Sequence, residues 1–227
     1  MTTRPSFPNW LPVAALLLAA SPLMAEDPKT EKTSLAKPTD VRFNTALHDE
    51  LQKRLKEDQT ARMAIIEWMK KQQLNDPEKI KKVNDEPIVK KLLELDHANT
   101  KWLKDIVDKY GWPSRSLVGD DGAHSAWLLV QHADKDREFQ KKCLELMKEL
   151  APKGEVSRAD VAYLTDRILV AENKKQIYGT QFQNVKGKME PVPIEDEANV
   201  EKRRKEAGLP TMEEYRQIVE KTYTQKK

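Results

Sequence analysis

Apolar residues recur three and four positions apart along most of the chain, between clusters of Pro, Gly, Asp and Asn. This spacing is typical of amphipathic helices separated by turns. It predicts helices over residues 40–73, 87–110, 123–132, 135–150, 157–172, 195–207 and from 211 onward, with a short helix over 76–83. Residues 117–122, which contain two Gly and two Asp, are predicted to form a loop.

The pattern changes after residue 176. Residues 176–185 and 189–194 are compatible with strands, and Lys186, Gly187 and Lys188 separate them. We therefore expect one short β-hairpin near residues 176–194. The predicted fold class is mainly α: an orthogonal or up-and-down helical domain of six to seven helices with this hairpin, over residues 40–225.

The N-terminal segment is predicted to be a signal peptide over residues 1–25. Its apolar stretch, Trp10–Ala20, is too short to span a bilayer, and small Ala25 precedes polar Glu26 at a suitable cleavage point. An uncleaved anchor is the alternative reading. Residues 26–39 form a polar, flexible linker. The mature protein would be exported, periplasmic or extracellular, with no stable membrane span.

Composition narrows the classes of partner and cofactor. Charged residues make up 34% of the chain, but the formal net charge is only +3, and loss of Arg4 with the signal peptide lowers it to +2. A nucleic-acid-binding protein needs a concentrated basic face, so we expect no nucleic-acid partner. Cys143, the single cysteine, excludes an intramolecular disulfide and a cysteine-based metal site. The spacing matches no metal or cofactor motif, and none is expected. A metal ion held by His132 with Asp134, Asp136 or Asp166 is the alternative.

Two predicted helices carry polar residues on their apolar faces. In the first, the stripe of Leu47, Leu51 and Ile65 is interrupted by Asp58 and Arg62, which lie four residues apart and can pair. In the helix over 87–110, Asn99 occupies the centre of an apolar stripe that is expected to end at Tyr110. Charged residues on a core face are uncommon unless they are paired or functional. An internal ion pair that fixes helix packing is the alternative to a binding role.

His132 is the principal candidate for chemistry. It ends the most apolar predicted helix, directly after Gln131 and two residues before Asp134, which can cap the next helix. A second acid–base pair, Asp166 and Arg167, lies beside apolar residues in a later helix. A histidine oriented by a carboxylate can act as a general base, so His132, Asp134 and Asp166 are the candidate catalytic residues.

The remaining candidates for ligand binding are polar side chains that can form directional hydrogen bonds. We expect the helices to bring the candidates toward one cavity, in which these residues would contact a ligand: Asp58, Arg62, Asn99, Gln131, Arg167, Gln176, Tyr178, Thr180 and Gln181.

Several short motifs together resemble a known family. They are Asp58-Gln59 with Arg62, Tyr110-Gly-Trp-Pro-Ser, Gln131-His-Ala-Asp, Asp166-Arg and Gln176-x-Tyr-Gly-Thr-Gln, in order over roughly residues 45–220. They are similar to a bacterial family catalogued as domain of unknown function 6624. The resemblance implies no activity or cofactor and indicates only which residues to follow.

Three functions remain open from the sequence. The first is an exported domain that binds a small polar or anionic ligand, with Arg62 or Arg167 holding an anionic group. The second is a hydrolase in which His132 is the general base that activates water. The third is a structural or protein-interaction domain whose polar residues form an internal network. The sequence does not decide whether the protein is an enzyme, or its oligomeric state.

Overall fold

The computed structural model describes residues 43–72, 83–185 and 188–224. These residues form seven α-helices and one two-stranded antiparallel sheet, so the mainly α prediction is confirmed. The predicted signal peptide and linker, and nearly all of the predicted helix over 76–83, lie outside the described residues. Among the residues described, no helix is both long and apolar enough to cross a membrane.

The helices follow the predicted order closely. They are α2 (Thr45–Lys71), α4 (Pro87–Tyr110), α5 (Arg115–Gln131), α6 (Arg137–Leu150), α7 (Arg158–Ala171), α8 (Val200–Glu206) and α9 (Met212–Thr224). Short 3-10 turns precede α4 (Val83–Asp85), follow α6 (Ala151–Lys153) and precede α8 (Glu197–Asn199). Helix ends match local signals: Gly111 ends α4, and Thr211 and Glu214 exchange capping hydrogen bonds at the start of α9.

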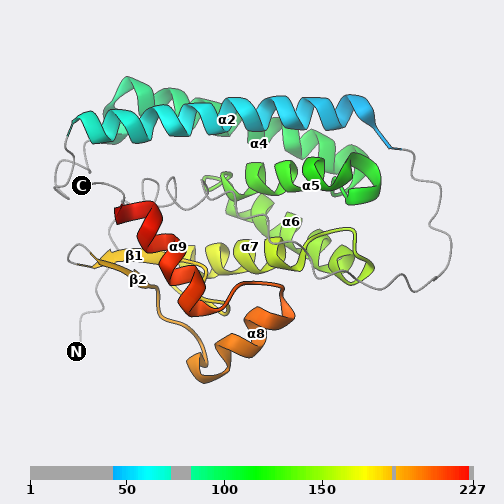
Figure 1. The fold of residues 1–227 in the computed structure, drawn as a ribbon. Helices are drawn as coiled ribbons and strands as arrows, with labels where there is room; N and C mark the ends of the chain where they lie inside the picture. Colours follow the sequence, from blue (N-terminus) through cyan, green and yellow to red (C-terminus); the bar gives the residue numbers. More distant parts are fainter. Residues whose placement is uncertain (1–42, 73–82, 186–187, 225–227) are drawn as a thin grey trace, which may run out of the picture.

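α5 is the central helix of the domain. It packs against α2 and α4 on one side and against α6 and α7 on the other, with the hairpin, α8 and α9 beyond α7 (Figure 1). From Gly122 to Gln131 nearly every residue of α5 is buried. This agrees with the sequence of that part of the helix, which has no polar face. Leu51 of α2, Leu103 of α4, Leu129 of α5 and Leu164 of α7 are at most 2% exposed and join the main core.

The predicted loop over residues 117–122 is reduced to a break at Gly119. α5 begins at Arg115, after Ser114 at its N-cap position, and continues through this segment. The polar residues mark a kink rather than a loop: Gly119 has φ 76° and ψ 171°, a conformation that glycine adopts without strain. A single glycine therefore interrupts the helical backbone, and helical segments continue on both sides of it.

Two further details correct the sequence interpretation. The buried face of α4 contains Val89 and Val107, whereas Tyr110, expected on that face, is 41% exposed. The N-cap of α6 is Asp136, which accepts from the Phe139 backbone N–H, and not Asp134. Asp134 is thereby free to pair elsewhere.

The hairpin is confirmed but is shorter than predicted. β1 (Phe182–Val185) pairs with β2 (Lys188–Pro191), with Phe182 opposite Pro191. Residue 176 meets Ile194 only in an isolated parallel bridge.

Arg204 of α8 is fully buried although it lies in a basic run over residues 203–205. It donates to the carbonyl oxygens of Pro210 and Tyr178.

Candidate functional site

Asp58 and Arg62 form the base of the candidate site on α2. They replace apolar residues on the buried face, and their exposed fractions are 0% and 3%. Four residues apart on a helix, their side chains meet. Arg62 Nε lies 3.1 Å from both carboxylate oxygens of Asp58, and Nη2 lies 2.9 Å from Oδ1. The predicted ion pair therefore exists and is buried.

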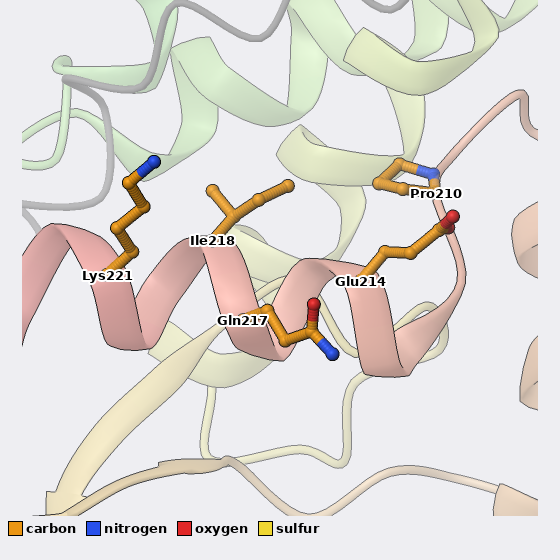
Figure 2. Close-up of a pocket in the computed structure, with 5 residues that line it drawn as sticks. All are labelled: Pro210, Glu214, Gln217, Ile218 and Lys221. Atoms are coloured by element: carbon orange, nitrogen blue, oxygen red, sulfur yellow. The ribbon is translucent and has the colours of Figure 1, made fainter.

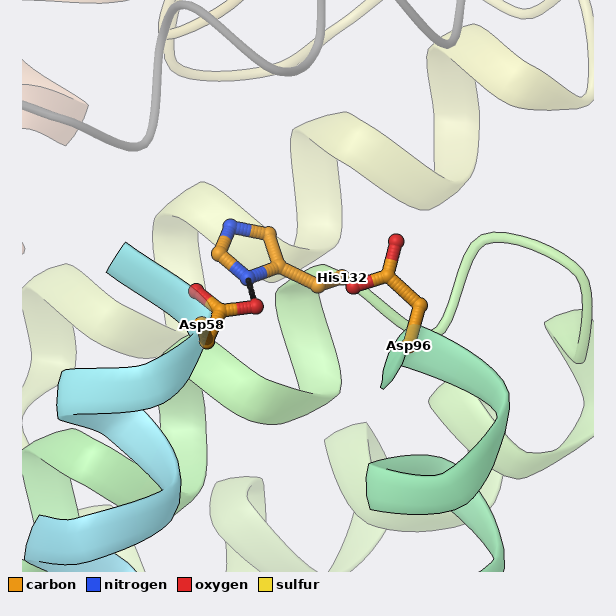
Figure 3. Close-up of side chains that lie close together, drawn as sticks. All are labelled: Asp58, Asp96 and His132. Carbon is orange, nitrogen blue, oxygen red and sulfur yellow. Dashed lines mark hydrogen bonds and ion pairs between the residues drawn. The ribbon is translucent and has the colours of Figure 1, made fainter. Parts of the chain in front are cut away.

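His132, at the C-terminal end of α5, lies directly against this pair. Its Nδ1 is 3.0 Å from Asp58 Oδ1, so residues 74 positions apart form a carboxylate–imidazole dyad (Figure 3). Asp58, and not Asp134 or Asp166, is the acid that orients His132. The other ring nitrogen, Nε2, is buried and has no hydrogen-bond partner among the described residues.

The charge states of the dyad follow from its surroundings. Burial lowers the pKa of His132 to about 4, with the Arg62 charge acting in the same direction and Asp58 against it. Burial works to raise the pKa of Asp58, but His132 and Arg62 outweigh it and lower that pKa to about 2. At neutral pH the pair is therefore an ionised carboxylate and a neutral imidazole.

Asp96 of α4 completes the cluster and was not among the predicted site residues. Arg62 Nη2 donates to Asp96 as well as to Asp58, so one guanidinium joins carboxylates from two helices. Burial raises the pKa of Asp96 to about 7, against the effect of Arg62, and the neighbouring Asp58 charge adds to the rise. The Asp96 side chain is 15% exposed, which places it at the edge of the cluster.

Asp134 and Arg167 form a second ion pair beside the first. Arg167 donates to the two oxygens of Asp134 from Nε at 2.9 Å and from Nη2 at 2.6 Å. Burial works to raise the pKa of Asp134, and Arg167 outweighs it and lowers the pKa. The Arg167 charge also acts on His132 and Asp96, so both pairs belong to one electrostatic cluster. We call Asp58, Arg62, Asp96, His132, Asp134 and Arg167 the His132 cluster.

Asn99 and Gln131 lie near the cluster but have other partners. Asn99 Oδ1 accepts from Arg54, one helical turn before Asp58, and its Nδ2 has no partner among the described residues. The Gln131 amide oxygen faces the Trp127 indole N–H and the Leu164 backbone N–H at 3.1 and 3.2 Å. Gln131 therefore ties α5 to α7.

The other predicted residues form a separate polar system around Asp166. This fully buried carboxylate accepts backbone N–H bonds from Ile177, Tyr178 and Thr180 at 2.7–3.0 Å, and a fourth bond from the Thr180 hydroxyl. The Gln176 side-chain amide donates to the carbonyl oxygen of Gln181 and accepts from its backbone N–H. These bonds fix the segment before β1, and none of them involves the His132 cluster.

The cluster also has to be considered as a metal centre. One possible ligand atom from each of Asp58, Asp96 and His132 lies within 4.8 Å of the others. However, Arg62 already bonds both carboxylates and supplies the positive charge that they require. A divalent cation would have to displace that guanidinium or lie beside it, so this donor set fits Arg62 better than a metal ion.

A surface hollow of about 430 Å³ lies along α9, away from the predicted residues. Figure 2 shows the residues that line this hollow, which are Pro210, Glu214, Gln217, Ile218 and Lys221. The hollow is open, and Glu214 is already engaged by Thr211. It contains none of the residues with candidate chemistry.

Comparisons with known proteins give a family and no activity. A family model described as a family of unknown function, DUF6624, matches residues 49–227. This range contains every residue of the His132 cluster. No curated protein and no solved structure matches the chain.

Proposed function

Since the chain belongs to the DUF6624 family, whose function is unknown, we propose a function from the site geometry: the helical domain binds a small polar ligand at the His132 cluster. The observation that carries this proposal is the buried Nε2 of His132, which has no partner among the described residues. Its ring is held in one orientation by Asp58, so the nitrogen faces a fixed direction.

The cost of this arrangement supports a binding role over a purely structural one. Leaving a buried polar atom without a hydrogen bond costs about 1–3 kcal/mol. Asp58 in the same cluster is fully used, because it accepts from Gln59, Arg62 and His132. A network that served only to fix helix packing has no use for a second ring nitrogen that stays unpaired. A ligand group on Nε2 would supply the missing partner.

The cluster also has an edge at the surface. The side chains of Asp96 and Asp134 are 15% and 32% exposed, whereas that of His132 is 2% exposed. A small ligand entering at that edge would meet polar groups first and would then lose most of its water. Such a site recognises its ligand by few, well-oriented hydrogen bonds in a dry environment.

A thermal-shift screen of small polar metabolites tests the proposal. A ligand at 100 times its Kd should stabilise the protein by about 2.7 kcal/mol. His132→Gln should lose this stabilisation, whereas His48→Gln should keep it. His48 is a matched control, because it also bonds a carboxylate but lies at the surface on α2. Equal stabilisation of both variants by every ligand found would refute binding at His132.

A hydrolase is the second candidate, and the Asp58–His132 dyad favours it. A neutral imidazole with its Nδ1 held by a carboxylate presents Nε2 as a general base for water. Hydrolysis by this route requires the neutral ring, so kcat/KM would fall as the pH drops toward the His132 pKa of about 4. A panel of chromogenic esters, amides and phosphate esters, assayed with wild type and Asp58→Asn, tests this. Activity that Asp58→Asn leaves unchanged would exclude the dyad.

Export remains part of the proposal. The apolar stretch at Trp10–Ala20 and the small residue Ala25 support cleavage before Glu26. N-terminal sequencing of the full-length product, expressed in a bacterial host and recovered from the periplasm, should begin at or near Glu26. A cytoplasmic product that retains Met1 would refute export.

A further inference from the structure

We infer that the ligand of the His132 cluster presents a hydrogen-bond donor, a hydroxyl or amino group, to His132 Nε2, and that anions are rejected there. This inference rests on the proposed function and specifies its ligand class. It follows from where Asp58 holds the imidazole proton and from how the nearby guanidinium groups are already used.

The first step is the position of the proton. The Nδ1 of His132 lies 3.0 Å from Asp58 Oδ1. An ionised carboxylate can only accept, so the hydrogen of this bond belongs to Nδ1. A neutral imidazole carries one proton, so Nε2 then has a lone pair and no hydrogen. Burial of the ring lowers the pKa of His132 and keeps it neutral at pH 7. Nε2 is therefore an acceptor that requires a donor.

The two arginines of the cluster, which are the natural partners of an anion, are already bonded to carboxylates. Arg62 uses Nε and Nη2 on Asp58, and Nη2 also contacts Asp96. Arg167 uses Nε and Nη2 on Asp134. An anionic ligand at Nε2 would meet a lone pair, and the guanidinium nitrogens named above are already held by carboxylates. Nε2 therefore offers an anion little compensation for its lost hydration.

A metal ion can also bind a bare imidazole nitrogen. The carboxylates of Asp58 and Asp96 are bonded to Arg62, so His132 Nε2 is the one lone-pair nitrogen that these cluster residues offer a metal ion. A protein site for a divalent cation needs three or more such ligands. A hydroxyl or amino group needs one acceptor, and the geometry supplies it.

Nitrogen NMR of the protein labelled with ¹⁵N-histidine tests the proton position directly. Long-range ¹H–¹⁵N spectra at pH 7 distinguish a protonated ring nitrogen from a bare one, and His132→Gln identifies the signals of His132. We expect Nδ1 to be protonated and Nε2 to be bare. A proton on Nε2, in either the other tautomer or the charged ring, would overturn the inference even if a ligand binds.

Titration with simple probes then tests the ligand class in the same spectra. Glycerol, methylammonium, acetate and Zn²⁺ supply a hydroxyl, an amine, an anion and a metal. We expect the Nε2 signal to shift saturably with glycerol or methylammonium and to stay unchanged with acetate. The ring signals of His48, which bonds Asp49 and Asp121 at the surface, report non-specific effects.

The outcomes separate the inference from the proposed function. A saturable response to acetate or Zn²⁺ alone would refute the donor class but leave binding at His132 intact. If no probe moves Nε2, and the metabolite screen also yields no ligand that depends on His132, the binding proposal fails and the inference fails with it. Asp58→Asn should free the tautomer and weaken the response to the donor probe at least tenfold. If that variant does not fold, the proton position in the wild type still decides the inference.

Discussion

Replacement of His132 by Gln should change how the stability of the protein depends on pH. His132 is 4% exposed, and burial lowers its pKa from 6.5 to about 4. The unfolded chain takes up a proton near pH 6.5, whereas the folded protein resists it until about pH 4. The stability that the neutral ring contributes is thus complete above pH 6.5 and is lost as the pH falls toward 4.

The magnitude follows from the two pKa values. Acidification from about pH 7.5 to about pH 4.5 should cost the wild type about 2.5 kcal/mol through His132 alone. His132→Gln has no group to titrate there, so it escapes this loss. The variant should be less stable than the wild type at pH 7.5, because it loses the bond to Asp58. The difference in free energy of unfolding should then shrink by about 2.5 kcal/mol at pH 4.5.

Urea unfolding at both pH values, followed by far-UV circular dichroism, measures the difference. His48→Gln is an informative control because hydrogen bonds to Asp121 and Asp49 raise the pKa of His48. The stability contributed by His48 is present below pH 6.5 and is lost as the pH rises through its raised pKa, so its replacement should act in the opposite direction. A difference between His132→Gln and wild type that stays constant or widens on acidification would refute a buried neutral imidazole.

Three further predictions concern other parts of the fold. Asp166→Asn should lower the free energy of unfolding, measured in urea, by about 2–4 kcal/mol, because an amide cannot accept all four bonds that the carboxylate receives. A loss no larger than that of the exposed control Glu190→Gln would contradict this. Cys143 is fully buried and its pKa is raised to about 12, so a thiol reagent such as Ellman's should react only after urea unfolds the protein, and rapid labelling of the native state would disprove the burial. Gly179→Ala should lower the melting temperature, because a φ of +71° disfavours a side chain and the new Cβ would lie 2.6 Å from the Met212 sulfur. Gly154→Ala, also at positive φ but with open space around it, should lower the melting temperature less.

Much of the fold could be predicted because it depends on local patterns. The 3.6-residue period identified α2, α4, α6 and α7, and it showed that Asp58 and Arg62 share a buried face. The same reasoning misjudged residues 117–122, because Gly and Asp in sequence are typical of a loop, whereas here packing against α2 keeps the chain helical on both sides of Gly119. Tertiary packing outweighed the local loop signal in this segment.

The site could be predicted only in part, for a related reason. The burial of Asp58 and Arg62 could be predicted from their place on an apolar face. The bond between Asp58 and His132 joins residues 74 apart, which no local spacing can reveal. Asp96 was missed although it lies three residues before Asn99 on the inner side of α4, and that spacing was the available signal. Asp166 was assigned to the same cavity, whereas its partners are backbone N–H groups of the chain after α7. These groups converge on Asp166 only when that chain has folded, so the sequence does not reveal them.

The adjacent residues Asp166 and Arg167 on α7 have a mechanical consequence. Successive side chains on a helix point about 100° apart, and these two hold different parts of the protein: Arg167 holds Asp134 in the His132 cluster, and Asp166 holds the segment before the hairpin. A rotation of α7 about its axis would strain both attachments at once. An event at the cluster that turns α7 would therefore be transmitted to the segment before the hairpin, where hydrogen exchange of the Thr180 amide could report it.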